Sequence, residues 1–238
     1  MGRAFEVRKA AMAKTAAAKT KVYARYGKEL YIAAKAGIPD PEMNQGLRRV
    51  IEKAKTAQVP ADVIKRAIDK AKGGSAESYT SVRYEGFGPN NCSIIVDCLT
   101  DNVNRTVSEV RNCFTKSKSK MGVSGSVSHL FDHIGLISFA SSDEEGVLDT
   151  LIGADVDVLD IECVEGQMNV TVAPNDVYKA KDALEAWKSD LTFDVLETTM
   201  QPQEMVKLSG EDVELFARLT SMLDEIDDVQ DVYHNVED

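Results

Sequence analysis

The sequence lacks any apolar run that approaches the roughly 18 residues a membrane-spanning helix needs. The stretch from Met1 to Lys9 also lacks the apolar core of a secretory signal. Only four cysteines occur, and they lie far apart, which favours reduced thiols over a disulfide framework. With 238 residues and 43% hydrophobic residues, we expect a cytoplasmic protein of up to three small domains that does not enter a membrane.

The sequence also has little that could perform catalysis. Gly86-Phe87-Gly88 leads to a proline and not to a helix, so it does not match a phosphate-binding loop. His129 and His133 are four residues apart, but a strand and its following turn would point them in different directions, so surface histidines are the better interpretation than metal ligands. No serine stands in a nucleophile elbow. We expect no enzyme activity, no catalytic residue, no metal and no cofactor.

Positive charge is missing from the middle of the chain. No Lys or Arg occurs from Met121 to Tyr178, a stretch that holds 11 Asp and Glu. Residues 1–73, by contrast, hold 17 Lys and Arg against 7 Asp and Glu, although the whole chain has a net charge of −11. Such a contrast predicts one part that meets a polyanion and another that does not. A lysine-rich surface that serves only solubility is the alternative.

Hydrophobic periodicity predicts three short helices in this basic part. The first carries a stripe that includes Tyr23 and Leu30, and Gly37 would end it in a left-handed cap. Asp40 would be the N-cap of the second helix, with a proline in its first turn. The third would begin after Pro60 and end at a glycine pair, so the three would form a small bundle.

Most of the basic side chains lie off these apolar stripes. We predict that twelve of them contact nucleic-acid phosphates: Lys21, Arg25, Lys28, Arg48, Arg49, Lys53, Lys55, Lys65, Arg66, and, in a lysine-serine loop, Lys116, Lys118 and Lys120. Residues 1–14 are expected to form a mobile basic arm on the same side. Because like charges repel, the acidic segment Glu211–Asp238 should face away from bound nucleic acid.

Strand patterns follow the bundle. Val82–Phe87, Cys92–Leu99 and Ser126–Phe131 are expected as strands, with a helix capped by Asn102 or Asn104 between the second and third. Residues 135–198 then follow the order β-α-β-β-α-β, which is typical of a ferredoxin-like unit.

The last segment is too short to fold alone. Residues 201–238 are expected to form one helix and one strand. The strand would complete the sheet begun before residue 133. We therefore predict an α+β fold in which the ferredoxin-like domain is inserted into the middle one. The expected domains are residues 1–76, residues 77–133 with 203–238, and residues 134–202.

Several blocks of the sequence, in their order and spacing, resemble the YebC/PmpR family. They are KVYARYGKE (21–29), PDPEMN (39–44), RYEGFGP (83–89), DNVNRT (101–106) and VYHN (232–235). The start, Met1 to Lys14, departs from the commoner family opening and resembles the YeeN-like bacterial branch. The resemblance covers essentially the whole chain.

The resemblance implies a helical N-terminal domain followed by two α/β domains, the last inserted into the middle one. It further implies a nucleic-acid-associated regulator. Bacterial members are described as transcriptional regulators that bind promoter DNA, so DNA is the expected partner. Other members, including a mitochondrial translational activator, act on the ribosome, which leaves ribosomal RNA as the alternative. The acidic C-terminal domains could instead dock a protein or sense a small molecule. The family has no accepted catalytic residues.

Overall fold

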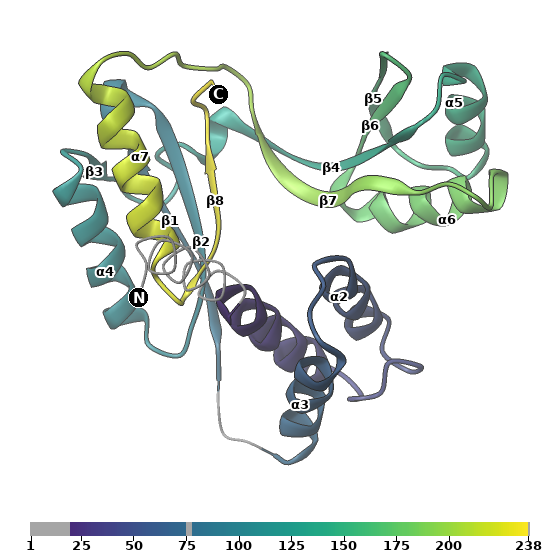
Figure 1. The fold of residues 1–238 in the computed structure, drawn as a ribbon, viewed down its shortest axis with the longest axis horizontal. Helices are drawn as coiled ribbons and strands as arrows, with labels where there is room; N and C mark the ends of the chain where they lie inside the picture. Colours follow the sequence, from purple (N-terminus) through teal and green to yellow (C-terminus); the bar gives the residue numbers. More distant parts are fainter. Residues whose placement is uncertain (1–19, 75–77, 238) are drawn as a thin grey trace, which may run out of the picture. The chain divides into compact units, whose positions relative to one another are not determined.

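The computed structural model describes residues 20–74 and 78–237, so the predicted basic arm of residues 1–14 lies outside the described residues (Figure 1). The chain divides into two compact units. One takes in the chain up to Ser126 together with Leu208–Val232, and the other comprises Val127–Lys207 and Tyr233–Asp238. Both are therefore assembled from segments distant in sequence.

The basic part forms the predicted helical bundle. Residues 20–35 are helical, and α2 (Gln45–Thr56) and α3 (Ala61–Lys72) follow. The predicted apolar stripes meet in one core: Leu30, Ala34, Leu47, Ile51, Ala54, Ile64, Ala67 and Ile68. The 3.6-residue period therefore located all three helices and the faces they bury.

The predicted start of the second helix was wrong. Asn44, and not Asp40, is the N-cap of α2, and its side-chain oxygen accepts a hydrogen bond from the backbone N–H of Leu47 at 3.0 Å. The Asn44 amide also donates to the carbonyl oxygens of Ala33 (2.8 Å) and Ile38 (3.0 Å) at the end of the first helix. One asparagine thus satisfies the ends of two helices, whereas Asp40 bonds only the N–H of Glu42 in a local turn.

The left-handed cap expected at Gly37 is also absent, because its φ is not positive. A Cβ at Gly37 would instead lie 3.0 Å from the amide nitrogen of Asn44. Gly37 is therefore small because the Asn44 side chain passes over it.

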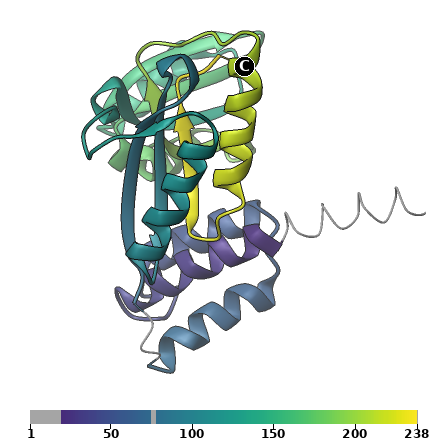
Figure 2. The same cartoon turned by 90° about the vertical axis from the view of Figure 1, so that its left-hand side faces the viewer.

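The first sheet has the strand order β3-β1-β2-β8. Its strands are β1 (Thr80–Phe87), β2 (Ser93–Thr100), the two-residue β3 (Lys120–Met121) and β8 (Val229–His234). Helices α4 (Val103–Lys116) and α7 (Glu211–Asp224) pack against each other over one face of this sheet (Figures 1 and 2). The strand β8 therefore lies beside β2, which confirms the prediction that the short C-terminal segment completes this sheet.

Two details of this sheet differ from the prediction. The segment Ser126–Phe131 is not a strand: residues Ser128–Leu130 form a 3-10 turn, and the strand begins only at Phe131. Its alternating serines and apolar residues imitate a strand, but the chain turns here because Glu85 holds the preceding loop, accepting from the N–H of Gly125 at 2.9 Å. The edge strand β3, which ends the lysine-serine loop, was missed.

The second sheet has the order β5-β6-β4-β7, and all neighbours are antiparallel. Its elements in chain order are β4 (Phe131–Ala140), α5 (Glu144–Gly153), β5 (Val158–Val164), β6 (Gln167–Val172), α6 (Val177–Trp187) and β7 (Phe193–Pro202). Alternate residues of β4 and β6, among them Ile137, Phe139 and Met168, form one core with Leu151 of α5 and Leu184 of α6. This is the predicted ferredoxin-like arrangement.

The fold class is α+β, with a helical N-terminal bundle, an α/β layer, and a ferredoxin-like layer inserted before the last helix and strand. The exact three-domain boundaries stay a prediction, because the bundle and the first sheet fall within one compact unit. Of the helices described, none has the length and apolar character needed to cross a membrane.

Candidate nucleic-acid interface

The basic side chains of α2 and α3 lie mostly outside the core of the bundle. Because the core takes the apolar stripes, the opposite positions project into solvent. Arg48, Lys55, Lys65 and Arg66 are exposed, whereas Arg49 and Lys53 are half-buried. We call these six residues the basic helical face.

Local contacts orient two members of this face without removing them from solvent. The Arg48 guanidinium donates to the carbonyl oxygens of Pro41 at 3.1 Å and Glu42 at 3.0 Å. Arg66 forms an ion pair with Asp62 at 2.8 Å, and both side chains are about 70% exposed (73% and 70%). Exposed pairs of this kind contribute little free energy, so a phosphate can compete for the arginine.

Three basic residues of the first helix that we predicted to contact nucleic acid instead pair with carboxylates of the same chain. Lys21 lies 3.7 Å from a carboxylate oxygen of Asp224, and Arg25 lies 2.8 Å from one of Asp231. Lys28 pairs with Asp228 at 2.8 Å. We expected the acidic C-terminal segment to face away from bound nucleic acid; its carboxylates instead pair with three cations of the first helix, so this segment adjoins part of the predicted binding surface.

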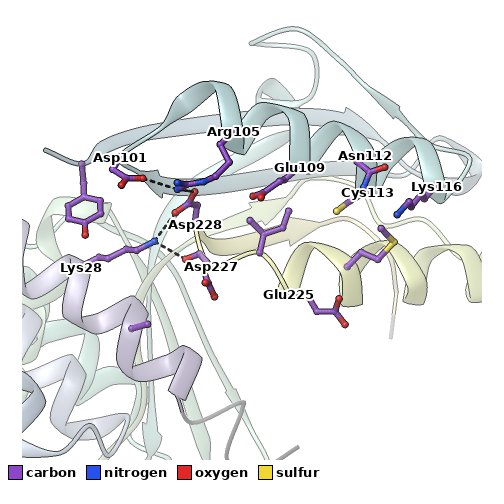
Figure 3. A pocket seen from close by; sticks show the side chains of 14 residues that line it. Lys28, Asp101, Arg105, Glu109, Asn112, Cys113, Lys116, Glu225, Asp227 and Asp228 are labelled. Carbon is purple, nitrogen blue, oxygen red and sulfur yellow. Dashed lines mark hydrogen bonds and ion pairs between the residues drawn. The ribbon is translucent and has the colours of Figure 1, made fainter. Parts of the chain in front are cut away.

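Asp228 is the centre of this contact, as Figure 3 shows. Besides Lys28, its carboxylate accepts hydrogen bonds from Arg105 (2.6 Å), Thr100 (3.0 Å) and Thr106 (2.8 Å), and only 5% of its side chain is exposed. Burial alone would raise the pKa of Asp228, but the hydrogen bonds from Arg105, Lys28 and Thr106 outweigh it and hold the pKa well below the ordinary carboxylate value. Asp228 is therefore a buried, fully satisfied carboxylate.

A hollow of about 730 Å³ lies beside this cluster, between the first helix, α4 and the end of α7 (Figure 3). Its lining mixes cations such as Lys116 with carboxylates such as Glu109 and Glu225. Within residues 20–74 and 78–237, no group of three or more His, Cys, Asp or Glu is placed to hold a metal ion. The hollow thus offers neither a uniform charge nor a ligand set for a metal.

The three lysines of the lysine-serine loop, Lys116, Lys118 and Lys120, have different surroundings. Lys118 pairs with Glu211 at 2.6 Å, although both side chains are more than half exposed. Lys116 ends α4 and borders the hollow, and Lys120 is exposed in the edge strand β3. These lysines are not part of the basic helical face, which is built from α2 and α3 alone.

Sequence reasoning missed Arg105 and Asp228 as a pair. Arg105 lies within the block DNVNRT, whereas Asp228 lies just before β8, in the acidic C-terminal segment. Nothing in a single sequence shows that residues 123 positions apart meet, so only the fold could reveal this pair.

The protein is an α+β protein in which a helical bundle precedes two antiparallel α/β layers. Two helices of the bundle carry the basic helical face. Family comparison agrees along almost the entire chain. Residues 3–74 match the model for the TACO1/YebC protein N-terminal domain, and residues 79–236 match that for the TACO1/YebC second and third domain. The chain therefore belongs to the TACO1/YebC family.

Similar proteins share this full length. A probable transcriptional regulatory protein of Pseudoalteromonas atlantica is 56% identical over 235 residues, which cover 99% of this chain and 97% of that protein. One of Vibrio parahaemolyticus is 54% identical and is covered completely. A crystal structure of a conserved hypothetical protein from Aquifex aeolicus has a TM-score of 0.75 at 35% identity, over 92% of this chain and 90% of that chain.

Proposed function

We propose that this protein is a regulator that binds nucleic acid through the basic helical face, with promoter DNA as its leading target. The observation that carries the proposal is the exposure of Arg48, Lys55, Lys65 and Arg66 on two adjacent helices of an otherwise acidic protein. The names of its relatives, probable transcriptional regulatory proteins, support the same role. It would act in the cytoplasm, without catalysis.

Ion pairs within the chain already occupy three cations of the first helix that we predicted to contact phosphates. Lys21, Arg25 and Lys28 pair with carboxylates of the same chain, so a nucleic-acid phosphate would have to displace those carboxylates. Arg48, Lys55, Lys65 and Arg66 are exposed, and the ion pair that Arg66 forms with Asp62 lies in solvent. We therefore assign the phosphate contacts first to α2 and α3.

Charge reversal on α2 tests this assignment. The double variant Arg48→Glu with Arg49→Glu should abolish binding to a labelled duplex while leaving the helical circular dichroism signal unchanged. A matched control, Lys188→Glu with Lys207→Glu, makes the same change at two exposed lysines of the other compact unit and should bind normally. Full binding by the α2 variant would refute the assignment.

Ribosomal RNA is the alternative target, and one observation favours it. The chain's net charge of −11 would repel the phosphates that flank a site on long duplex DNA. RNA is recognised chiefly through folded shape and unpaired segments, which suits a compact cationic bundle. Cross-linking in cells with sequencing of both attached DNA and attached RNA separates the two: discrete promoter peaks support the DNA target, and ribosomal RNA without promoter peaks supports the alternative.

A further inference from the structure

A second hollow, of about 520 Å³, runs between the first helix and α3. Tyr23, Gly27 and Tyr31 line it from the first helix, Arg66 and Lys70 from α3, and Tyr79 from just before β1. We call it the tyrosine groove. Its volume is within the range of small-ligand sites, roughly 300–1,000 Å³.

The charged side chains that line the tyrosine groove are all basic, although Lys28 pairs with Asp228 and Arg66 with Asp62 outside the lining. Its lining includes Lys28, Arg66 and Lys70, and among the described residues that line it there is no Asp or Glu. The hollow beside Asp228 differs, since five carboxylates line that one. An anionic ligand therefore complements the tyrosine groove and not its neighbour.

The walls of the groove are aromatic. The rings of Tyr31 and Tyr79 meet edge to face with their centroids 5.9 Å apart, but Tyr31 is only 3% exposed, so the half-buried Tyr23 and Tyr79 supply the accessible rings. The Lys70 ammonium lies 5.7 Å from the Tyr31 ring, and the Lys28 ammonium 5.8 Å from the Tyr79 ring. Aromatic rings bordered by cations are the surface on which single-stranded nucleic acids stack their bases while their phosphates meet positive charge.

Gly27 gives independent support. It lies in the middle of the helix formed by residues 20–35, where glycine destabilises relative to alanine. A Cβ at Gly27 would meet no atom of the protein within 4 Å, so packing within the described chain does not require a glycine there. The missing side chain instead keeps the wall of the groove open for close approach by a ligand.

We propose that the tyrosine groove binds an unpaired nucleotide of a nucleic-acid strand, with its base against Tyr23 and Tyr79 and its phosphate toward Arg66 and Lys70. The inference rests on the proposed function and deepens it, because it assigns a base-binding site next to the phosphate-binding face. Arg66 belongs to both surfaces, so one strand can follow α3 and place a base in the groove.

Gly27→Ala gives a test in which stability and affinity move in opposite directions. The added methyl group should raise the Tm of the full chain by about 2–4 °C, because it removes the helix penalty of glycine. It should also weaken binding of single strands about fivefold or more, the scale on which a base–aromatic contact is lost. Gly153→Ala is the matched control: it is exposed at the end of α5 with open space at its Cβ, and should leave affinity unchanged.

The probe is a short oligonucleotide with one 2-aminopurine, whose fluorescence falls when the base stacks. It is prepared as single-stranded RNA, single-stranded DNA and duplex DNA, so the arms identify which polymer supplies the nucleotide. Quenching on binding of a single strand, retained in the control Gly153→Ala and lost in Gly27→Ala, is the expected result. Binding of single strands that leaves the 2-aminopurine fluorescence unchanged would overturn the proposal.

The groove and the basic helical face can fail separately. Suppose that Arg48→Glu with Arg49→Glu abolishes binding, that Gly27→Ala leaves it unchanged, and that 2-aminopurine stays fluorescent in the complex. This result would overturn the base-binding groove and leave the proposed function intact. The absence of binding to all three probes would overturn both.

Discussion

The ammonium of Lys28, in the first helix, lies 2.8 Å from a carboxylate oxygen of Asp228, which precedes the last strand 200 residues later. Lys28 also donates to the backbone oxygens of Asp227 (2.9 Å) and Leu99 (3.3 Å). One lysine thereby joins the helical bundle to the end of β2 and to the turn that leads into β8. The positive charge of the first helix serves this junction before it serves a ligand.

The first prediction concerns the stability of this junction. Asp228→Ala should lower the free energy of unfolding by about 3 kcal/mol, since it leaves Lys28 without its buried counter-charge. The neighbouring Asp227→Ala is the matched control and should change it by less than about 0.5 kcal/mol, because that side chain is exposed. Urea denaturation measures both, and equal effects of the two variants would contradict the role of Asp228.

The second prediction follows from the lowered pKa of Asp228. A carboxylate whose pKa is lower in the folded state stabilises the fold above its unfolded pKa of about 3.9, and this stabilisation is lost as the pH falls toward the folded pKa. The stability difference between the natural protein and Asp228→Asn should therefore be constant above about pH 5 and shrink below about pH 4. Urea midpoints measured from pH 7 to pH 3 test this, and a difference that grows on acidification would contradict it.

The third prediction separates the two capping roles of Asn44. Asn44→Ala should cost about 1–2 kcal/mol, since it removes both the acceptor for Leu47 and the donors to the first helix. Asn44→Asp keeps the acceptor but not the donors, so its stability should fall between those of the natural protein and the alanine variant. Thermal unfolding gives the order, and an aspartate variant no better than alanine would show that the N-cap bond contributes nothing.

The fourth prediction concerns Cys98, a buried free thiol in β2. Burial raises the pKa of this thiol to about 12, and the neighbouring carboxylate of Asp228 adds to the shift, so it stays neutral at pH 7. Alkylating reagents should therefore modify Cys98 only when the chain unfolds, and Cys98→Ser should reduce stability without changing nucleic-acid affinity. Rapid alkylation of the folded protein at Cys98, read by mass spectrometry, would contradict this.

Sequence periodicity predicted the helices, their buried faces and the ferredoxin-like order, because each is set by residues close in the chain. It failed where a more distant residue decides: Asn44 outcompetes Asp40 as a cap because it also reaches the end of the previous helix. It identified the basic residues of the first helix but not their partners, since Asp224, Asp228 and Asp231 look like any solvated acidic run. Gly27 gave no signal until the groove beside it was known.

Salt dependence gives a further expectation for the basic helical face. If about six of its cations engage phosphates, affinity should fall about a thousandfold or more between 50 and 200 mM salt. Removing Lys65 by substitution with Ala should reduce the salt slope by about one phosphate contact. An affinity that is insensitive to salt would mean that phosphates are not the ligand.

The measurement that tests the central claim most directly is ultraviolet cross-linking of the full chain to bound nucleic acid, followed by mass spectrometry of the linked peptides. Peptides from α2 and α3, residues 45–72, should carry the attached nucleotides, together with peptides that contain Tyr23 or Tyr79 from the tyrosine groove. Cross-links confined to the ferredoxin-like layer, residues 131–202, with none in residues 45–72, would contradict the account.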